Sequence, residues 1–264
     1  MNKLRTASAS LILLISIIIC SSFKKTDPDK FLKKNGFSYI LNSTEVSAEN
    51  KTGFYISKTE VSNQEYLDFL NDLKEQGRTA DYEIAKVDTA AWKNAMDYST
   101  VYESYYFQHE MYANYPVLNI SFEGAKLYCE WLTQQIKKEG YNVLIRLPDS
   151  IEWKTAARGG NNQNIYSWEG NSNVNKKGFY KCNSKKGVEC DYITAPVLSF
   201  KKNEFGIYNA CGNVAEMLNE KGTHKGGSWN SAENYIKLDS KDEYAGISTP
   251  SPYIGFRPVA IIME

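Results

Sequence analysis

The chain has 264 residues, which is enough for one large domain or two small ones with a buried core. Its composition, with 42% hydrophobic and 23% charged residues, is ordinary for a globular protein and excludes a disordered or collagen-like chain. The 31 basic and 31 acidic residues cancel, and no long basic run is present, so we predict no binding of nucleic acid.

The first residues have the pattern of an export signal. Lys3 and Arg5 precede an apolar run at residues 11–19, which is too short for a membrane-spanning helix of about 20 apolar residues. We therefore predict a signal peptide over residues 1–19 and an exported protein.

Two cleavage patterns fit the residues that follow the apolar run. Ile19 and Cys20 end a stretch similar to a bacterial lipobox, in which Cys20 is lipidated, although lipoboxes usually carry a small residue in place of Ile19. The alternative is ordinary signal-peptidase cleavage after Ser22. We favour lipidation because the charged residues within 20–36 are expected to form a structureless tether. Lipidation predicts an outer-membrane or periplasm-facing lipoprotein, and ordinary cleavage predicts a periplasmic or secreted protein.

Regular elements are predicted mainly between residues 37 and 160. Short alternations of apolar and polar residues over 37–61 indicate strands. Three helices follow, two of which begin with a capping box, in which Ser or Asp and a Glu three residues later bond each other's backbone amides. The expected helices run from Ser62 to Gly77, from Ser121 to Gly140 and from Asp149 to Gly159.

Two regions are predicted to be irregular. Residues 97–115 contain six tyrosines and are expected to form a loop whose rings pack onto the body of the protein; a contact surface is the alternative. After residue 160 the chain is rich in Asn, Gly, Lys and Ser and has no helical period. Because no linker divides it, we predict a single domain over residues 37–264.

Export changes the interpretation of the cysteines, because disulfides persist outside the cytoplasm. Cys182 and Cys190 enclose seven residues and are the predicted disulfide. Cys129 lies on the apolar face of a predicted helix, where we expect a free buried thiol. No CxxC pair is present, so the sequence supports neither a thioredoxin-like site nor a zinc knuckle.

Ten short segments, taken together and in order, resemble the sulfatase-modifying-factor family, whose best-known member is the formylglycine-generating enzyme. The resemblance covers about 225 residues and implies an α+β domain of the irregular C-type-lectin-like kind, with sparse secondary structure. The segments are 54–66, 115–121, 128–132, 146–153, 157–160, 194–197, 203–209, 212–216, 225–229 and 254–257.

The resemblance ends at the residues that carry the family's oxidation chemistry. The formylglycine-generating enzyme binds copper(I) through two cysteines, five residues apart, after its Gly-Gly-Ser-aromatic segment; thiolates are soft ligands that suit this ion. The corresponding positions here are Ser231 and Ile236, so we expect no copper. Other relatives bind iron through clustered histidines, and this chain has only His109 and His224, so we expect no iron.

Calcium is the metal that the resemblance still implies. The segment 212–216 is similar to a family stretch whose Asn, Glu and neighbouring carbonyls bind Ca²⁺, a cation that prefers six to eight oxygen ligands. The residues at the first predicted site are Asn213, Val214 and Glu216, and those at the second are Asn183, Ser184 and a carboxylate from Asp191 or Glu189. The alternative is that these side chains only hydrogen-bond the loops.

Two arginines also match family positions. Arg146 and Arg257 are expected to be buried, and buried arginines are almost always paired. We therefore predict that each bonds a carboxylate or backbone carbonyls, with Glu60 and Glu152 as candidate partners.

These features favour a non-catalytic member of the family. We expect an exported, lipid-anchored domain that is a structural or ligand-binding part of a cell-envelope or surface assembly, as in the bacterial gliding-motility and secretion lipoproteins that it resembles. The expected partner is an envelope or surface protein, or a peptide or glycan ligand. Two alternatives stay open: an oxidoreductase that modifies a peptide or small molecule through non-standard residues, and a lectin-like binding module.

Overall fold

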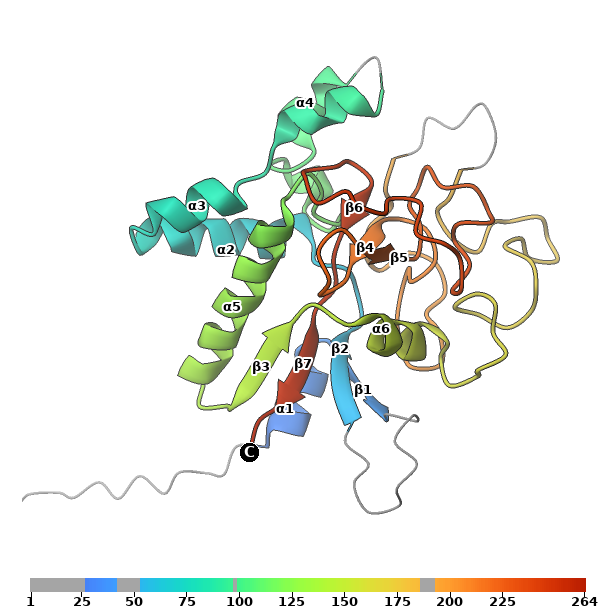
Figure 1. The fold of residues 1–264 in the computed structure, drawn as a ribbon, viewed down its shortest axis with the longest axis horizontal. Coiled ribbons are helices and arrows are strands. Elements are labelled where there is room, and N and C mark those ends of the chain that lie inside the picture. The colour runs from blue at the N-terminus through green and yellow to red at the C-terminus, as the bar shows by residue number, and fades with distance from the viewer. Residues whose placement is uncertain (1–26, 42–52, 97–98, 186–192) are drawn as a thin grey trace, which may run out of the picture.

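The computed structural model describes residues 27–41, 53–96, 99–185 and 193–264, and its elements are labelled in Figure 1. The helices of this part of the chain are α1 (Pro28–Lys34), α2 (Asn63–Glu75), α3 (Thr79–Ala85), η1 (Thr89–Asn94), α4 (Thr100–Tyr105), η2 (Glu110–Tyr112), α5 (Phe122–Lys138) and α6 (Ser150–Ala157). The strands are β1 (Phe37–Leu41), β2 (Gly53–Ser57), β3 (Val143–Arg146), β4 (Ala215–Met217), β5 (His224–Lys225), β6 (Ile254–Gly255) and β7 (Val259–Ile262).

The larger sheet brings the two ends of the domain together. Its strands lie in the order β1-β2-β7-β3, and every neighbouring pair is antiparallel. The last strand, β7, lies between β2 and β3, so that Ala260 pairs with Tyr55 on one side and with Ile145 on the other (Figure 1). The C-terminal strand is therefore needed to complete the sheet.

Both faces of this sheet are buried, because successive side chains of a strand point to opposite sides. Tyr55 and Ala260 pack with the apolar stripes of α2 and α5 on one face. Ile56 and Val259 pack on the other face with Trp153 of α6 and with loops from the second half of the chain. The sheet thus separates a helical layer from a layer built mostly of loops.

All three predicted helix starts are confirmed. The Ser62 hydroxyl accepts from the Glu65 amide at 3.3 Å, and the Glu65 carboxylate accepts from the Ser62 amide at 2.8 Å. The same reciprocal bonds join Asp149 and Glu152 at the start of α6, and Ser121 caps α5. The strands expected within residues 37–61 are β1 and β2.

Part of the predicted tether at residues 20–36 is regular structure. Residues 28–34, which we assigned to it, form α1, with the side chain of Asp27 as its cap. Leu32 is fully buried against the sheet, and the Tyr55 hydroxyl donates to Asp29 at 2.6 Å. One buried leucine among charged residues is too weak a pattern to predict such a helix.

The tyrosine-rich region is more regular than predicted, since it contains α4 and η2 in place of a continuous loop. Four of its rings pack onto the body, as expected, namely Tyr102, Tyr106, Tyr112 and Tyr115, whereas Tyr105 is about half exposed. Tyr106 is buried, its hydroxyl donates to the Pro116 carbonyl at 2.8 Å, and its own carbonyl accepts from the Asn63 amide at 2.9 Å. The helices α3 and η1 before it were not predicted at all.

The second half has sparse secondary structure, as the family resemblance implies. Among the described residues from 158 to 214 there is no helix and no named strand, and the small sheet that follows, β5-β4-β6, has strands of two or three residues. Side chains replace the missing backbone ladder. The Asn203 amide, for example, donates to the Ala156 and Ala157 carbonyls and accepts from the Phe205 and Ile207 amides.

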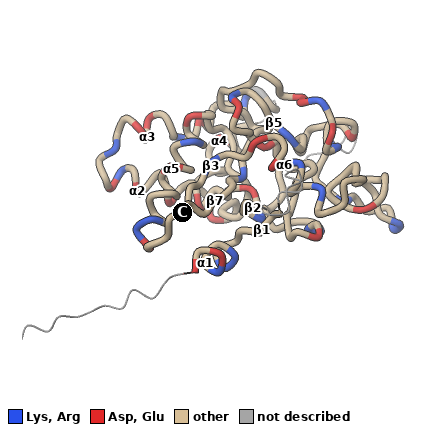
Figure 2. The backbone as a smooth tube through the Cα atoms, turned by 60° about the horizontal axis from the view of Figure 1, so that its bottom comes forward, with Lys and Arg blue, Asp and Glu red and all other residues tan. Residues whose placement is uncertain are grey.

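Acidic and basic residues are interspersed along the backbone in the view of Figure 2 and are not gathered by sign. None of the helices in the described part of the chain combines the length and apolar character that crossing a bilayer requires. The predicted signal peptide at 1–19 and the lipidation site Cys20 lie outside the described residues.

Candidate functional site

The glycine pair, Gly226 and Gly227, shapes the loop that carries Ser231 and Ile236, the positions that correspond to the copper-binding cysteines of the family. Gly227 has a φ of +68°, and a Cβ atom there would lie 2.9 Å from Ile236 Cγ2 and 3.2 Å from Ser231 Cβ. Only glycine fits a left-handed position with such close neighbours. Ser231 and Ile236 therefore pack against the same stretch of backbone, as the family spacing implies.

The Ser231 side chain belongs to a buried cluster of hydroxyl groups. Its oxygen accepts from the Ser228 amide at 2.8 Å, lies 3.2 Å from the Tyr244 hydroxyl and donates to Glu243. The Ser228 and Tyr244 hydroxyls lie 2.6 Å apart, and burial raises the pKa of Tyr244 to about 12. Neutral hydroxyls are poor ligands for a soft ion such as copper(I).

Ser231 and Ile236 are both fully buried, and the cavity beside them is small. The cavity between the glycine pair and Tyr244 has a volume of about 10 Å³, roughly that needed for one water molecule. Ile236 is fully buried and packs in the apolar cluster with Trp153 and Leu238. The position that performs oxidation in the family is thus closed in this chain.

Glu216, predicted as a calcium ligand, is the partner of Arg257 instead. The Arg257 Nε and Nη2 atoms donate to the two Glu216 carboxylate oxygens, each at 2.7 Å. The Trp153 indole N–H donates to the same carboxylate, also at 2.7 Å, and all three side chains are buried. Because a guanidinium occupies both oxygens, Glu216 does not fit a site for a second cation.

The Asn213 side chain at the first predicted calcium site is also engaged. The Asn213 amide donates to Glu60 at 2.8 Å, and its oxygen accepts from the Ala195 amide at 2.7 Å. Val214 is fully buried and packs closely against Gly255. The alternative interpretation, in which these side chains hydrogen-bond the loops, therefore fits the first site better than calcium does.

The second predicted calcium site is described only in part. Asn183 and Ser184 are buried, and the Asn183 amide donates to the Ile193 carbonyl at 2.8 Å. The carboxylate candidates Glu189 and Asp191 lie outside the described residues, so calcium at this loop stays a prediction. Within the described part, no group of three or more His, Cys, Asp or Glu side chains has a metal-binding arrangement.

Both arginines are paired, as predicted, but only Arg257 is buried; Arg146 is about one-third exposed, contrary to expectation. Arg146 makes two 2.7 Å hydrogen bonds to Glu152, which was a candidate. Arg257 bonds Glu216, while the nearest Glu60 oxygen is 4.0 Å away. Burial raises the pKa of Glu60 to about 7, opposed by the charge of Arg257 and reinforced by that of Glu216.

The predicted cysteine states are confirmed in one case and untested in the other. Cys129 is a free, buried thiol, and burial raises its pKa. Cys190 lies outside the described residues, so the predicted disulfide with the buried Cys182 stays a prediction. Cys211 is buried and free, and its sulfur accepts from the Ser167 amide at 3.3 Å.

Sequence reasoning missed the residues that close the site. Glu243 and Tyr244 come from a turn 12 and 13 residues after Ser231, and no motif marks them. His224, near the glycine pair, is a satisfied buried histidine: its Nδ1 atom lies 3.2 Å from Asp242. The sequence offered one signal for these residues: segment 239–243 is rich in carboxylates and has no helical or strand period, which indicates a polar turn.

The loop-rich α+β fold and the Gly-Gly-Ser loop are features of the sulfatase-modifying-factor class of domains, and comparison with known families agrees. The family of the sulfatase-modifying factor enzyme 1-like domain matches residues 24–262, so the chain belongs to this family. The match includes α1, in agreement with its packing on the sheet.

Individual relatives show how the chain is placed within the family. It is 37% identical over 111 residues to the formylglycine-generating enzyme of Thermomonospora curvata, a match that covers 39% of this chain and 32% of the relative. It is 26% identical over 250 residues to the chaperone protein LppX of Paenibacillus barcinonensis, which covers 83% of this chain and 85% of that protein. A third relative, the inactive C-alpha-formylglycine-generating enzyme 2 of Bos taurus, is 30% identical over 106 residues, which cover 39% of this chain and 32% of the relative.

The chain spans about a third to a half of the length of the first curated relatives, the formylglycine-generating enzymes. Solved structures agree on the fold. The crystal structure of CarF has a TM-score of 0.57 at 21% identity over 86% of this chain and 96% of its own. PvdO from Pseudomonas aeruginosa has a TM-score of 0.54 at 20% identity over 86% of this chain and 91% of its own.

Proposed function

We propose that this chain is an exported, lipid-anchored member of the family that binds a protein partner in a cell-envelope or surface assembly, such as a gliding or secretion apparatus. In this role it performs no copper-dependent oxidation. The observation that carries the proposal is the closed site, where Ser231 lies in a hydroxyl cluster and Ile236 in an apolar cluster.

Two relatives support a role other than oxidation. One is named an inactive formylglycine-generating enzyme, so the family contains members without this activity. Another is named a chaperone protein, and it is matched over most of its own length and most of this chain. A chaperone acts on other polypeptides, which favours a protein as the partner.

The proposed location rests on the N-terminal residues. A basic start, an apolar run at 11–19 and Cys20 directly after it support export with lipid attachment. An acyl chain and a nearby charged segment would hold the domain at a membrane surface.

An oxidation assay tests the central part of the proposal. The purified domain is incubated with copper(I), a reductant, oxygen and a Cys-x-Pro-x-Arg peptide, and the peptide is analysed by mass spectrometry. We expect no aldehyde product, while the Thermomonospora curvata enzyme forms it under the same conditions. Formation of aldehyde by this chain would overturn the proposal.

The anchor is tested separately by the intact mass of the protein purified from membranes. We expect a mass that starts at Cys20 and includes acyl chains, and we expect Cys20→Ala to release the protein from the membrane fraction. A protein that starts at Phe23 without acyl chains would contradict the lipid anchor and support cleavage after Ser22.

A further inference from the structure

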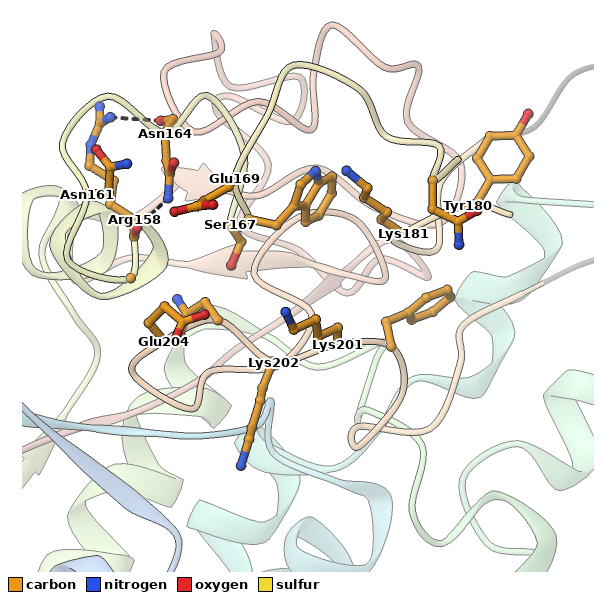
Figure 3. Close-up of a pocket in the computed structure, with 15 residues that line it drawn as sticks. Arg158, Asn161, Asn164, Ser167, Glu169, Tyr180, Lys181, Lys201, Lys202 and Glu204 are labelled. Carbon is orange, nitrogen blue, oxygen red and sulfur yellow. Dashed lines mark hydrogen bonds between the residues drawn. The ribbon is translucent and has the colours of Figure 1, made fainter. Parts of the chain in front are cut away.

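A second cavity, away from the closed site, has the character of a ligand-binding cleft. It has a volume of about 420 Å³ and lies between the loop at 158–181 and the loop at 200–204 (Figure 3). None of its lining residues belongs to the Ser231 cluster. Cavities of this size accommodate small ligands or short peptide segments.

One wall of the cleft is fixed by an aromatic stack. The Trp168 ring lies parallel to Tyr166, with a centroid separation of 4.9 Å and an interplanar angle of 3°. Its indole N–H donates to the Ser172 carbonyl at 3.0 Å, and the Lys181 ammonium lies 5.7 Å from the ring centroid. The Trp168 ring is therefore held in place. Because Tyr166 and the Lys181 ammonium already lie against it, the ring is not an open surface on which a sugar could stack.

The opposite wall contains a strained aromatic residue. Phe200 has a φ of +60°, in the left-handed region that bulky side chains rarely adopt, and 36% of it is exposed. Backbone strain of this kind persists where surrounding structure enforces it, and it is concentrated at functional sites. The exposed Phe200 ring lines the cleft, where it is available to contact a bound ligand.

Charges of both signs line the cleft and are separated along it. In Figure 3 the Glu169 and Glu204 side chains lie toward the end marked by Arg158, whereas Tyr180 lies at the other end and Lys181 between them. Within the described part of the chain, these two glutamates form no ion pair, and neither do Lys181 and Lys201. A ligand with charges of both signs would satisfy them.

Arg158 does not take part in this charge pattern, because its guanidinium already has partners. It bonds Asp239 at 2.7 Å and the carbonyls of Asn162 and Asn164 at 2.8 and 3.0 Å. Its function is to fix the loop that forms this end of the cleft.

We propose that this cleft binds a short peptide segment that carries a basic, an acidic and an aromatic side chain. The basic group would face Glu169 and Glu204, the acidic group Lys181 and Lys201, and the aromatic group the end at Tyr180. A neutral glycan would form no ion pair with either set of charges. The proposal rests on the proposed protein-binding role and names the surface that serves it.

The first experiment is calorimetric titration of the domain with two capped tripeptides, lysine–aspartate–phenylalanine and the reversed sequence. We expect one of them to bind at least tenfold more tightly than its neutral counterpart, in which glutamine and asparagine replace the charged residues. Absence of saturation by either charged peptide below about 1 mM would overturn the proposal, as would binding of chitotriose in their place.

Three variants locate the binding. The double variant Glu169→Gln, Glu204→Gln should bind the charged peptide at least fivefold more weakly than the wild type. Phe200→Gly should weaken the binding by a similar factor. The glycine variant removes a ring while relieving the left-handed strain, so its Tm should be unchanged or higher. Glu220→Gln, at an exposed acid outside the cleft, is the matched control and should bind the peptide normally.

Unchanged binding by Phe200→Gly and by the double variant would contradict the location. The titrations are done without copper, so their outcome is independent of the oxidation assay. Aldehyde formation with normal peptide binding would refute only the proposed function, and absent binding with no aldehyde would refute only the cleft.

Discussion

The two halves of the domain are stabilised in different ways. Between residues 28 and 157, helices and strands bury periodic apolar stripes, and the capping boxes of α2 and α6 satisfy the ends of their helices. Between residues 158 and 257, polar side chains take over, as where the Asn203 amide bonds four backbone groups. The closed site and the cleft both lie in this second half, so their geometry depends on buried polar contacts more than on packing.

The largest effect is expected where one polar residue joins the two halves. Arg257 bonds Glu216 through two nitrogens, and its other contacts are the Ser57 and Tyr208 carbonyls. Arg257→Met would leave the buried Glu216 carboxylate without its cationic partner. We expect the free energy of unfolding to fall by about 3–5 kcal/mol, as for other broken buried ion pairs, measured by urea denaturation.

Arg146→Met is the matched control for this prediction. Arg146 has the same bidentate geometry toward Glu152, but it is about one-third exposed. Because a partly solvated pair contributes little, we expect a loss of about 1 kcal/mol or less. Equal losses of unfolding free energy in the two variants would show that the stabilisation by an ion pair does not depend on its burial.

The second prediction concerns pH, through the buried Glu60. Its folded-state pKa is raised to about 7 from an ordinary value of 4.5, so the folded protein holds this proton more tightly than the unfolded chain. The contribution of Glu60 to stability should therefore be fully present below about pH 4.5 and be lost as the pH rises through about 7. The expected loss is on the order of a few kcal/mol, because a rise of one unit in pKa corresponds to about 1.4 kcal/mol.

Glu60→Gln isolates this contribution, since the amide cannot ionise. Urea denaturation at pH 5, 6, 7 and 8 should show a wild-type stability that declines relative to the variant, with no further relative decline above about pH 8. If the difference between the two proteins is the same at every pH, Glu60 does not titrate in this range.

The third prediction compares the two modes of stabilisation directly. Asn203→Ala removes four hydrogen bonds in the loop layer and leaves buried backbone groups without partners. We expect a loss of about 2–3 kcal/mol, against about 1 kcal/mol for Ser62→Ala, which removes a helix cap. Thermal denaturation of both variants gives the comparison, and a larger effect at Ser62 would reverse it.

The sequence predicted well those elements that local chemistry marks. Capping boxes are short-range signals, so Ser62 and Asp149 gave the starts of their helices directly. Leu32 shows the opposite case: one buried leucine in a charged segment has no periodicity, and only the sheet behind it makes α1 stable. Local patterns are insufficient wherever the stabilising contact is distant in the chain.

The candidate site was predictable only in part, for the same reason. The spacing after Gly227 placed Ser231 and Ile236 beside each other, because loop geometry within ten residues is local. The partner of Glu216 was not foreseeable from spacing, since Arg257 is 41 residues away in the chain. A motif identifies which residues are present, and the tertiary structure determines whether they bind a cation or an arginine.

The fourth and smallest prediction tests calcium at the loop that includes Asn183 and Asp191. A ligand that binds only the folded state raises stability by about 1.4 kcal/mol at tenfold excess over its Kd, which is a Tm shift of about 3–6 °C for a domain of this size. EDTA should therefore lower the Tm of the wild type, and Asp191→Asn should remove the difference. Glu216→Gln should remain sensitive to EDTA despite its lower starting Tm, because Arg257 already occupies that carboxylate. If the wild-type Tm is the same with EDTA and with excess calcium, the polar side chains stabilise the loop half without a metal ion.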